Sequence, residues 1–205
     1  MSLYSALRPI CHLIQKVLWP TKIIGKNNVK DTKGGAIVIS NHYSTPDSII
    51  IATNFFKHEL HVMVKEEAFK KSFASKFLTN IGCISVKRGE PDIGAYKAVL
   101  KVLNSDKKMM IFPEGTRNKA GTKELAPFKN GVASFAIKSG KPVIPMLYYR
   151  MHKLFHRNYL IVGEPIDLRE AGFDRSKVDE ATSYIQGKMY DLRNKVDKIA
   201  EGKNN

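Results

Sequence analysis

Residues 41–47 read NHYSTPD, and this stretch decides how the rest of the chain can fold. The apolar, β-branched run at residues 36–39 just before it predicts a buried strand. Thr45 and Pro46 predict the start of a helix, with Thr45 as the N-cap and Pro46 at the first helical position. On one continuous helix, His42 and Asp47 would point about 140° apart, so only a turn between strand and helix lets them meet.

A histidine at a strand end that faces an aspartate in the first turn of a helix has a chemical use. The carboxylate of Asp47 would hold the imidazole of His42 in one tautomer and stabilise it as it takes up a proton. The alternative is a buried histidine bonded to a nearby loop group. This stretch alone leaves both interpretations open.

Length and composition indicate one globular domain. The 205 residues are 43% hydrophobic and 26% charged, enough for a substantial core. The net charge of +15 predicts an anionic partner, which could be nucleic acid, an acidic lipid surface or a phosphorylated substrate. Cys11 and Cys83 stand apart from each other and from any ligand-spaced histidine, so a reduced cytosolic setting fits best.

The first twenty residues predict an amphipathic helix. Apolar side chains recur on one helical face of residues 2–19, at Leu3, Leu7, Ile10, Ile14 and Val17. Pro9 predicts a kink, or a helix that begins near it. No apolar run is long enough to span a bilayer, and no secretory signal is expected. The helix could pack on its own domain, or lie in a membrane interface with Trp19 at headgroup depth.

A second loop repeats the arrangement of the first. Residues 109–112 predict a buried strand that runs directly into Glu114, Gly115, Thr116 and Arg117. Open α/β sheets build their sites just beyond the carboxyl ends of strands. Gly115 permits close backbone approach, Thr116 offers a hydroxyl, and Arg117 offers a planar fork that binds phosphate. A plain surface turn is the alternative.

The remaining elements predict a sheet with helices between its strands. Lys65 ends a strand at residues 60–64, and residues 82–88 suit a strand that delivers Arg88 to a sheet edge. Residues 142–148 predict a strand that Pro145 breaks or confines to an edge position. His58 and His61 have a spacing seen in metal sites, but on a strand they point to opposite faces, so no metal is expected. Two further helices are predicted, one after Pro91 with a core face of Ile93, Tyr96, Leu100 and Leu103, and one from about residue 174 with an apolar stripe.

Four motifs together carry a resemblance to a known family. NHYSTPD, GCISVKR, FPEGTR and VIPM, at residues 41–47, 82–88, 112–117 and 143–146, resemble in this order the four blocks of the glycerolipid acyltransferases. More narrowly, they are similar to the bacterial 1-acyl-glycerol-3-phosphate acyltransferases. The likeness runs from about residue 23 to 165. Tyr43 stands where Gln is common and Asn118 where Ser is common, and neither change removes a charged or catalytic group.

The resemblance implies both a fold and a reaction. The fold is α/β, with a central mostly parallel or mixed sheet flanked by helices. Residues 1–20 would form an amphipathic helical segment in contact with the membrane, and residues 21–205 the catalytic domain. The reaction would move a fatty acyl group from acyl-CoA or acyl-carrier protein to the sn-2 hydroxyl of lysophosphatidic acid. Alternatives are a sibling enzyme with another acceptor, such as glycerol 3-phosphate, and a non-enzymatic binder of anionic lipid or nucleic acid.

The resemblance also assigns residues. His42 would be the general base and Asp47 would orient it. The glycerol phosphate would be held by Arg88, Gly115, Thr116 and Arg117, with Glu114 shaping the pocket and Lys65 assisting. Val143, Ile144 and Pro145 would line the acyl or acceptor region. Ser44 is a conceivable nucleophile, but it lacks a G-x-S-x-G elbow. The resemblance implies no metal, no tightly bound cofactor and no nucleic acid partner. It implies a peripheral location on the cytoplasmic face of the cell membrane, against an anionic surface.

Overall fold

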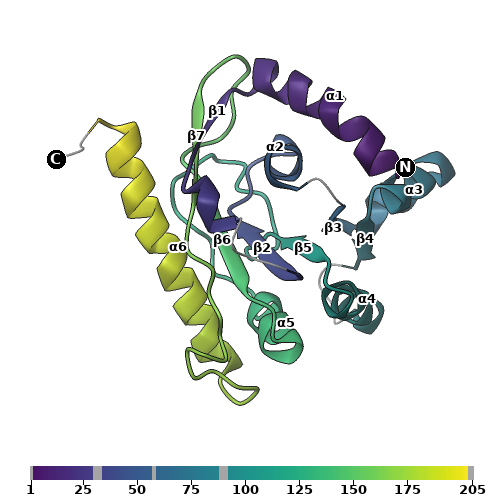
Figure 1. Cartoon of the computed structure of the whole chain (residues 1–205), viewed down its shortest axis with the longest axis vertical. Coiled ribbons are helices and arrows are strands. Elements are labelled where there is room, and N and C mark those ends of the chain that lie inside the picture. The colour runs from purple at the N-terminus through teal and green to yellow at the C-terminus, as the bar shows by residue number, and fades with distance from the viewer. Residues whose placement is uncertain (1, 30–33, 57–58, 88–91, 203–205) are drawn as a thin grey trace.

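The computed structural model describes residues 2–29, 34–56, 59–87 and 92–202, and these ranges form one α/β domain around a seven-stranded sheet (Figure 1). The strand order is β1-β7-β6-β2-β5-β3-β4. Neighbouring strands are parallel except β6 and β7, which are antiparallel. The predicted mostly parallel, mixed sheet is therefore confirmed. The strands are β1 (Thr21–Ile24), β2 (Ala36–Ser40), β3 (Leu60–Lys65), β4 (Cys83–Val86), β5 (Lys108–Ile111), β6 (Val143–Tyr148) and β7 (Asn158–Val162).

Helices cover both faces of the sheet because successive strand residues point to opposite faces. Ile37 and Ile39 of β2 pack into one cluster with helices α4 (Ile93–Asn104), α5 (Gly131–Ser139) and α6 (Val178–Ala200). Ala36 and Val38 of the same strand pack into the other cluster, with α2 (Pro46–Phe55). Helix α1 (Leu3–Leu18) lies outside α2, and α3 (Ser72–Asn80) lies near β4 at the edge of the sheet (Figure 1).

Helix α1 is a single helix that continues through Pro9, so it does not begin near that residue, which was one of the two predicted alternatives. Two side chains that precede the proline hold the first turns of the helix against α2. The hydroxyl of Tyr4 lies 3.1 Å from the carbonyl oxygens of Ala52 and Phe56, and Arg8 donates to the carbonyl of Thr53 at 2.7 Å. These side chains bind carbonyls at the carboxyl end of α2, where helical C=O groups run out of partners within the helix. The carbonyl of Ala52 also accepts from the N–H of Phe56.

The polar contacts of α1 leave its apolar face outward. Five apolar side chains of this helix are exposed, namely Leu3, Ile10, Leu13, Ile14 and Val17. The buried face holds Tyr4 and Gln15 instead. This arrangement reverses the usual order of a surface helix, whose apolar stripe faces the core. No helix within the described ranges combines the length and the apolar character needed to cross a bilayer.

The start of α2 is built differently from the sequence-based expectation. Pro46 occupies the first turn as predicted, but Thr45 has a helical backbone and its side chain does not cap the helix. Asp47 accepts from the backbone N–H groups of Tyr43 and Ser44 instead, at 2.6 and 2.8 Å. A carboxylate in the first turn also suits the positive end of the helix dipole. Helix α2 ends at Phe55.

Pro145 neither breaks β6 nor places it at an edge, which corrects the prediction. The strand lies between β2 and β7 and is buried throughout. Val143 bonds on one side to Ile166, and Pro145 accepts from Gly163 on the same side, because alternate residues of a strand point the same way. The imide nitrogen therefore faces Gly163, just beyond β7, so the bond that proline cannot make falls at the end of the β6–β7 pairing and not within it.

Helices α4 and α6 match their sequence-based predictions to different degrees. Helix α6 buries the expected stripe, including Ala181, Ile185, Met189 and Val196. In α4, Leu103 is buried, but Ile93 is 68% exposed and does not belong to the core face. Asp92 caps α4 by accepting from the N–H of Ala95 at 2.9 Å. Ile93 therefore lies in the first turn, where the helix has not yet reached the sheet.

Candidate active site

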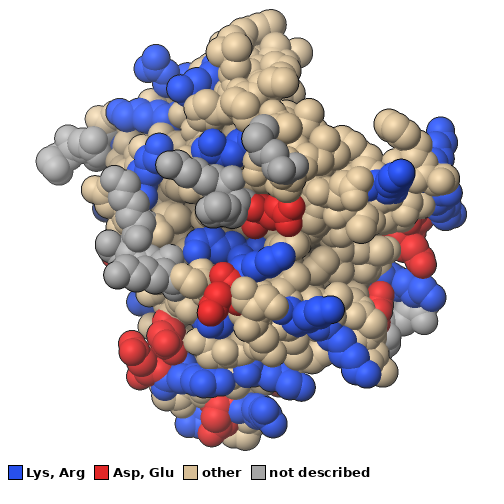
Figure 2. Space-filling model, turned by 45° about the vertical axis from the view of Figure 1, so that its right-hand side comes forward, with Lys and Arg blue, Asp and Glu red and all other residues tan. Residues whose placement is uncertain are grey.

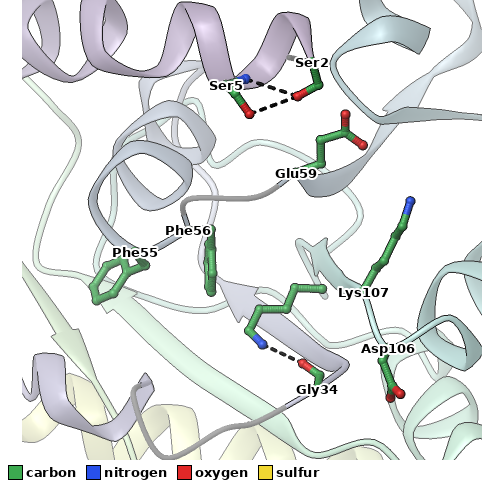
Figure 3. Close-up of a pocket in the computed structure, with 9 residues that line it drawn as sticks. Ser2, Ser5, Gly34, Phe55, Phe56, Glu59, Asp106 and Lys107 are labelled. Carbon is green, nitrogen blue, oxygen red and sulfur yellow. Dashed lines mark hydrogen bonds between the residues drawn. The ribbon is translucent and has the colours of Figure 1, made fainter.

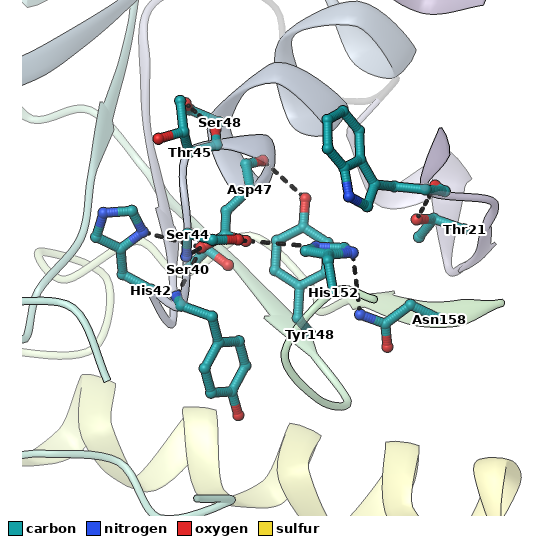
Figure 4. A network of polar contacts seen from close by, with 12 residues as sticks. Thr21, Ser40, His42, Ser44, Thr45, Asp47, Ser48, Tyr148, His152 and Asn158 are labelled. Atoms are coloured by element: carbon teal, nitrogen blue, oxygen red, sulfur yellow. Dashed lines mark hydrogen bonds and ion pairs between the residues drawn. The ribbon is translucent and has the colours of Figure 1, made fainter. Parts of the chain in front are cut away.

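The two loops singled out in the sequence meet at the carboxyl edge of the sheet. Strands β2 and β5 are parallel neighbours, with Ile39 opposite Ile111, so the segments that follow them emerge side by side. His42 follows β2, and Glu114 and Arg117 follow β5. Figure 4 shows the polar network that results around Asp47. This edge is where parallel sheets assemble binding and catalytic groups.

His42 and Asp47 form a buried pair, as the turn between them predicted. The Nδ1 atom of His42 lies 2.9 Å from Oδ2 of Asp47, whose side chain is fully buried. The same oxygen accepts two backbone N–H bonds, from Tyr43 and Ser44. Three donors converging on one oxygen fix the carboxylate, and the carboxylate in turn fixes the ring of His42.

The contacts of the other ring nitrogen define the tautomer. The guanidinium of Arg117 can only donate, and its Nε lies 3.2 Å from Nε2 of His42. Nε2 therefore accepts, and Nδ1 carries the proton donated to Asp47. Phe112 stacks on the imidazole, with ring centroids 3.7 Å apart and planes inclined by 14°. The basic lone pair of His42 thus points out of the fold, toward Arg117.

The loop that carries Arg117 also clamps the backbone of His42. Glu114 accepts from the N–H of His42 at 3.2 Å and from the N–H of Ala126 at 3.0 Å. Asn118 donates its N–H to the carbonyl of His42 at 2.8 Å. Burial raises the pKa of Glu114, although both backbone bonds act against that rise. Glu114 therefore positions the histidine from below and does not face the open side of the site.

Gly115, Thr116 and Arg117 form the accessible side of this loop. Thr116 and Arg117 are exposed, and Nη2 of Arg117 donates to the hydroxyl of Thr45 at 3.1 Å. Gly115 has a φ of +68°, which a residue with a side chain adopts only under strain. A Cβ atom there would also lie 2.9 Å from Cε of Lys129, so the backbone and a lysine approach each other closely. Two cations and a bare backbone suit an anionic group such as phosphate.

A second histidine, which sequence reasoning missed, contacts the same aspartate. Nε2 of His152 lies 3.3 Å from Oδ1 of Asp47, and the side chain is 1% exposed (Figure 4). The amide nitrogen of Asn158 lies 3.2 Å from Nδ1 of His152, and as a donor it makes Nδ1 an acceptor. Nε2 of His152 then carries the proton that faces Asp47. No local pattern marks His152, because it lies in the loop between β6 and β7, far along the chain from residue 47.

The environment of Asp47 keeps its side chain charged. Burial would raise the pKa of this carboxyl, but the adjacent ring of His152 and the hydrogen bonds from His42 and the backbone of Ser44 outweigh burial and hold the pKa below its ordinary value. The hydroxyl of Ser44 lies 3.3 Å from Oδ1 of Asp47. Ser44 therefore supports the aspartate, and His42 is bonded to Asp47 and Arg117.

The remaining predicted site residues are only partly brought together. Lys65 is exposed at the carboxyl end of β3, the strand next to β5, and so lies on the same edge as His42. Arg88 falls outside the described residues. Val143 and Ile144 are fully buried in the two core clusters, and Pro145 is buried between them. The structure places these three in the core, on the interior strand β6, and not on the surface of the site.

The histidines considered for a metal have other partners. Nδ1 of His61 lies 2.9 Å from the carbonyl oxygen of Gly82, and His58 is outside the described residues. Within the described ranges, no three His, Cys, Asp or Glu side chains are grouped as metal ligands would be.

A cavity of about 620 Å³ lies at the opposite edge of the sheet (Figure 3). Phe55 and Phe56 at the end of α2 line it, together with Lys107 and Lys108 at the start of β5. Open α/β sheets bind ligands beyond the carboxyl ends of their strands, and the groups described above gather at that edge. This cavity is therefore separate from the His42 site.

Comparison with known proteins places this geometry in context. The chain matches the family model described as Acyltransferase over residues 20–149. It is 28% identical over 140 residues to a 1-acyl-sn-glycerol-3-phosphate acyltransferase of Borreliella burgdorferi, covering 67% of this chain and 54% of that protein. It is also 28% identical over 187 residues to the Escherichia coli protein of the same name, covering 84% and 75% of the two chains.

A solved structure resembles the fold over nearly the whole chain. The crystal structure of the 1-acyl-sn-glycerophosphate acyltransferase PlsC from Thermotoga maritima superposes with a TM-score of 0.71 at 21% identity. The match covers 96% of this chain and 78% of that one. The chain spans about half the length of several of the curated relatives that it matches.

Proposed function

Because the chain belongs to the acyltransferase family, we propose that it transfers a fatty acyl group from a thioester to the sn-2 hydroxyl of 1-acyl-glycerol 3-phosphate, giving phosphatidic acid. The observation that carries this proposal is the orientation of His42. Its Nδ1 is held by a buried carboxylate, and its Nε2 lone pair points outward beside a guanidinium. A base and a phosphate-binding cation therefore stand within one hydrogen bond of each other.

The proposed reaction begins with the acceptor displacing Arg117 from His42. The guanidinium turns to the phosphate of the lysolipid, and the hydroxyl takes its place at Nε2. As the hydroxyl oxygen attacks the thioester carbonyl, its proton passes to Nε2, and Asp47 stabilises the imidazolium. The tetrahedral intermediate then collapses, the carbon–sulfur bond breaks, and the departing thiolate takes the proton back. The thioester is already activated, so no protein nucleophile, metal or tightly bound cofactor is required.

The acceptor is identified by what the open side of the site offers. Arg117, Thr116 and the backbone at Gly115 fit a phosphate, and Lys65 and Arg88 are assigned to the same group from the family motifs. Glycerol 3-phosphate would offer the same phosphate and a free hydroxyl, but no acyl chain. The outward apolar face of α1 favours an acceptor that resides in a bilayer. Acyl-CoA and acyl-carrier protein both present the thioester that the chemistry needs.

The proposed location is a peripheral one on the anionic, cytoplasmic face of the cell membrane. Helix α1 is fastened to α2 through Tyr4 and Arg8, which leaves its apolar side chains free to enter the interface. Lys16 and other cations near this helix would add attraction to anionic lipid, each about 1 kcal/mol. A lipid product with two acyl chains could then leave directly into the bilayer.

A small panel of purified variants and substrates tests the proposal. Wild type is assayed with lysophosphatidic acid and glycerol 3-phosphate as acceptors, and with acyl-CoA and acyl-carrier protein as donors. His42→Ala should lower kcat by about 10²–10⁴ without loss of the folded state. Ser44→Ala is the matched control and should retain most activity, because Ser44 only supports Asp47. Near wild-type turnover in His42→Ala would show that the base is elsewhere. If the wild-type protein turned over neither acceptor, it would instead be a basic binder without enzymatic activity.

A further inference from the structure

The loop between β6 and β7 exposes two large apolar side chains at its tip. Leu154 is 53% exposed and Phe155 is 67% exposed. The backbone of Phe155 has a φ of +61°, a left-handed conformation that is rare for a bulky residue and costs free energy to hold. The reaction described above uses neither side chain. An exposed aromatic residue held in an unfavourable conformation suggests a role outside the fold itself.

The tip lies directly beside the end of helix α1. The N–H of Phe155 donates to the carbonyl of Leu18 at 2.8 Å, and the N–H of Asn158 donates to the carbonyl of Pro20 at 2.9 Å. Strands β1 and β7 then continue side by side, with Thr21 opposite Asn158. Figure 1 shows the loop and the end of α1 together at the top of the molecule. The tip therefore extends the apolar stripe of α1, whose exposed members nearest this end are Leu13, Ile14 and Val17.

The segments around α1 and around the β6–β7 loop both lack acidic residues. Residues 1–30 contain no Asp or Glu, and neither do residues 140–163, although the chain has 19 acidic residues. Lys153 and Arg157 are exposed on either side of the tip, and Lys16 is exposed on α1. In Figure 2 the upper end of the molecule is uncharged, with Lys and Arg side chains below it on one side. Apolar tips surrounded by cations complement an anionic lipid surface.

We propose that Leu154 and Phe155 insert into the interface of an anionic bilayer as a second membrane contact beside α1. This inference deepens the proposed membrane location and rests on it. One helix lying on a membrane leaves the domain free to roll about the helix axis. A second contact to the side of the helix end stops that rotation and fixes which way the carboxyl edge of the sheet faces. His152, two positions before Leu154, already joins this loop to Asp47, so the contact is close to the catalytic pair.

A single-tryptophan reporter tests insertion directly. In a Trp19→Phe background, Phe155→Trp places the reporter at the tip, and Ile93→Trp places a matched one on α4, where the native side chain is equally exposed at 68%. Both variants are mixed with phosphatidylcholine–phosphatidylglycerol vesicles that contain brominated acyl chains. Fluorescence at position 155 should be quenched by bromine and shielded from aqueous iodide, whereas position 93 should show the opposite. Equal quenching at the two positions overturns the inference.

Vesicle co-sedimentation measures the contribution of the tip. The double variant Leu154→Ser, Phe155→Ser should lower the partition coefficient at least about tenfold, because two apolar side chains no longer enter the interface. Ile93→Ser should leave it unchanged, and both variants should acylate detergent-dispersed acceptor at the wild-type rate, which confirms that they fold. If the intact protein sediments and the double variant does so equally, this inference fails while the contact through α1 stands. If the intact protein does not sediment at all, both fail.

Discussion

Replacing Asp47 with asparagine separates the charge of this residue from its hydrogen bonds. Three N–H donors converge on Oδ2 of Asp47, from Tyr43, Ser44 and the ring of His42. The amide oxygen of Asp47→Asn must take that position, since an NH₂ group there would face three donors. The NH₂ group is then left at the Oδ1 position, facing the N–H of His152. The tautomer of His42 is kept, and the negative charge is lost.

The size of the effect follows from that charge. An imidazolium and a carboxylate about 4 Å apart attract by about 4 kcal/mol at an effective dielectric constant of 20. Asp47 is in direct contact with His42, and its charged form is favoured in the folded protein. Losing this stabilisation when the ring is protonated should lower kcat by roughly 10³. The KM values should change little, because Asp47 is buried beneath the ring and does not reach the acceptor.

The assay is the initial rate of thiol release with both substrates saturating, and a double variant supplies the control. Asp47→Asn combined with His152→Ala removes the opposed N–H groups but does not restore the charge. The double variant should therefore regain free energy of unfolding relative to Asp47→Asn alone, while kcat stays low. A kcat for Asp47→Asn within a few-fold of wild type, or a recovery of kcat in the double variant, would refute the role given to the charge.

Three further predictions follow from the same contacts. Arg117→Ala should raise the KM for the lysolipid by roughly 10–100-fold, because it removes a charge-assisted bond of about 1.5–3 kcal/mol. The KM for the acyl donor should stay unchanged, and an equal rise in both KM values would contradict a phosphate contact. Because the pKa of Asp47 is lowered in the folded state, its charge stabilises the fold above about pH 4, and this stabilisation is lost as the pH falls below that value. In urea unfolding, the free energy of unfolding of Asp47→Asn should therefore fall less steeply below about pH 4 than that of wild type. Ile10→Ser with Ile14→Ser should abolish sedimentation with anionic vesicles and keep turnover of detergent-dispersed acceptor; unchanged sedimentation would exclude α1 as the membrane contact.

The parts of the site that the sequence predicts are those whose geometry is local. A strand end, a proline turn and the first turn of a helix lie within seven residues, so their stereochemistry alone brings His42 to Asp47. The motif after β5 is equally compact, and the parallel pairing of β2 and β5 follows from alternating strands and helices. The sequence therefore predicts both loops and the edge on which they meet.

The contacts that the sequence does not predict depend on distant segments. His152 reaches Asp47 only because β6 lies next to β2, and no spacing in the sequence encodes that neighbourhood. Local propensity predicts an interruption at Pro9 and at Pro145. In the fold, Tyr4 and Arg8 hold the turns before Pro9 against α2, and Pro145 faces Gly163 at the end of the β6–β7 pairing. Val143 and Ile144 belong to a familial motif, and the motif alone cannot distinguish a residue that lines a site from one that supports it.

The reversal of direction between β6 and β7 connects the chemistry to the surface. Strand β6 runs parallel to β2, so the loop after it emerges at the edge where His42 lies. Strand β7 returns from that edge, and because β1 is parallel to β7, β1 must begin there as well. The end of α1 is thereby brought to the same edge, against Phe155. One loop thus contacts Asp47 through His152 and α1 through Phe155, so the loop that supports the aspartate is also the one whose tip we propose to enter a membrane.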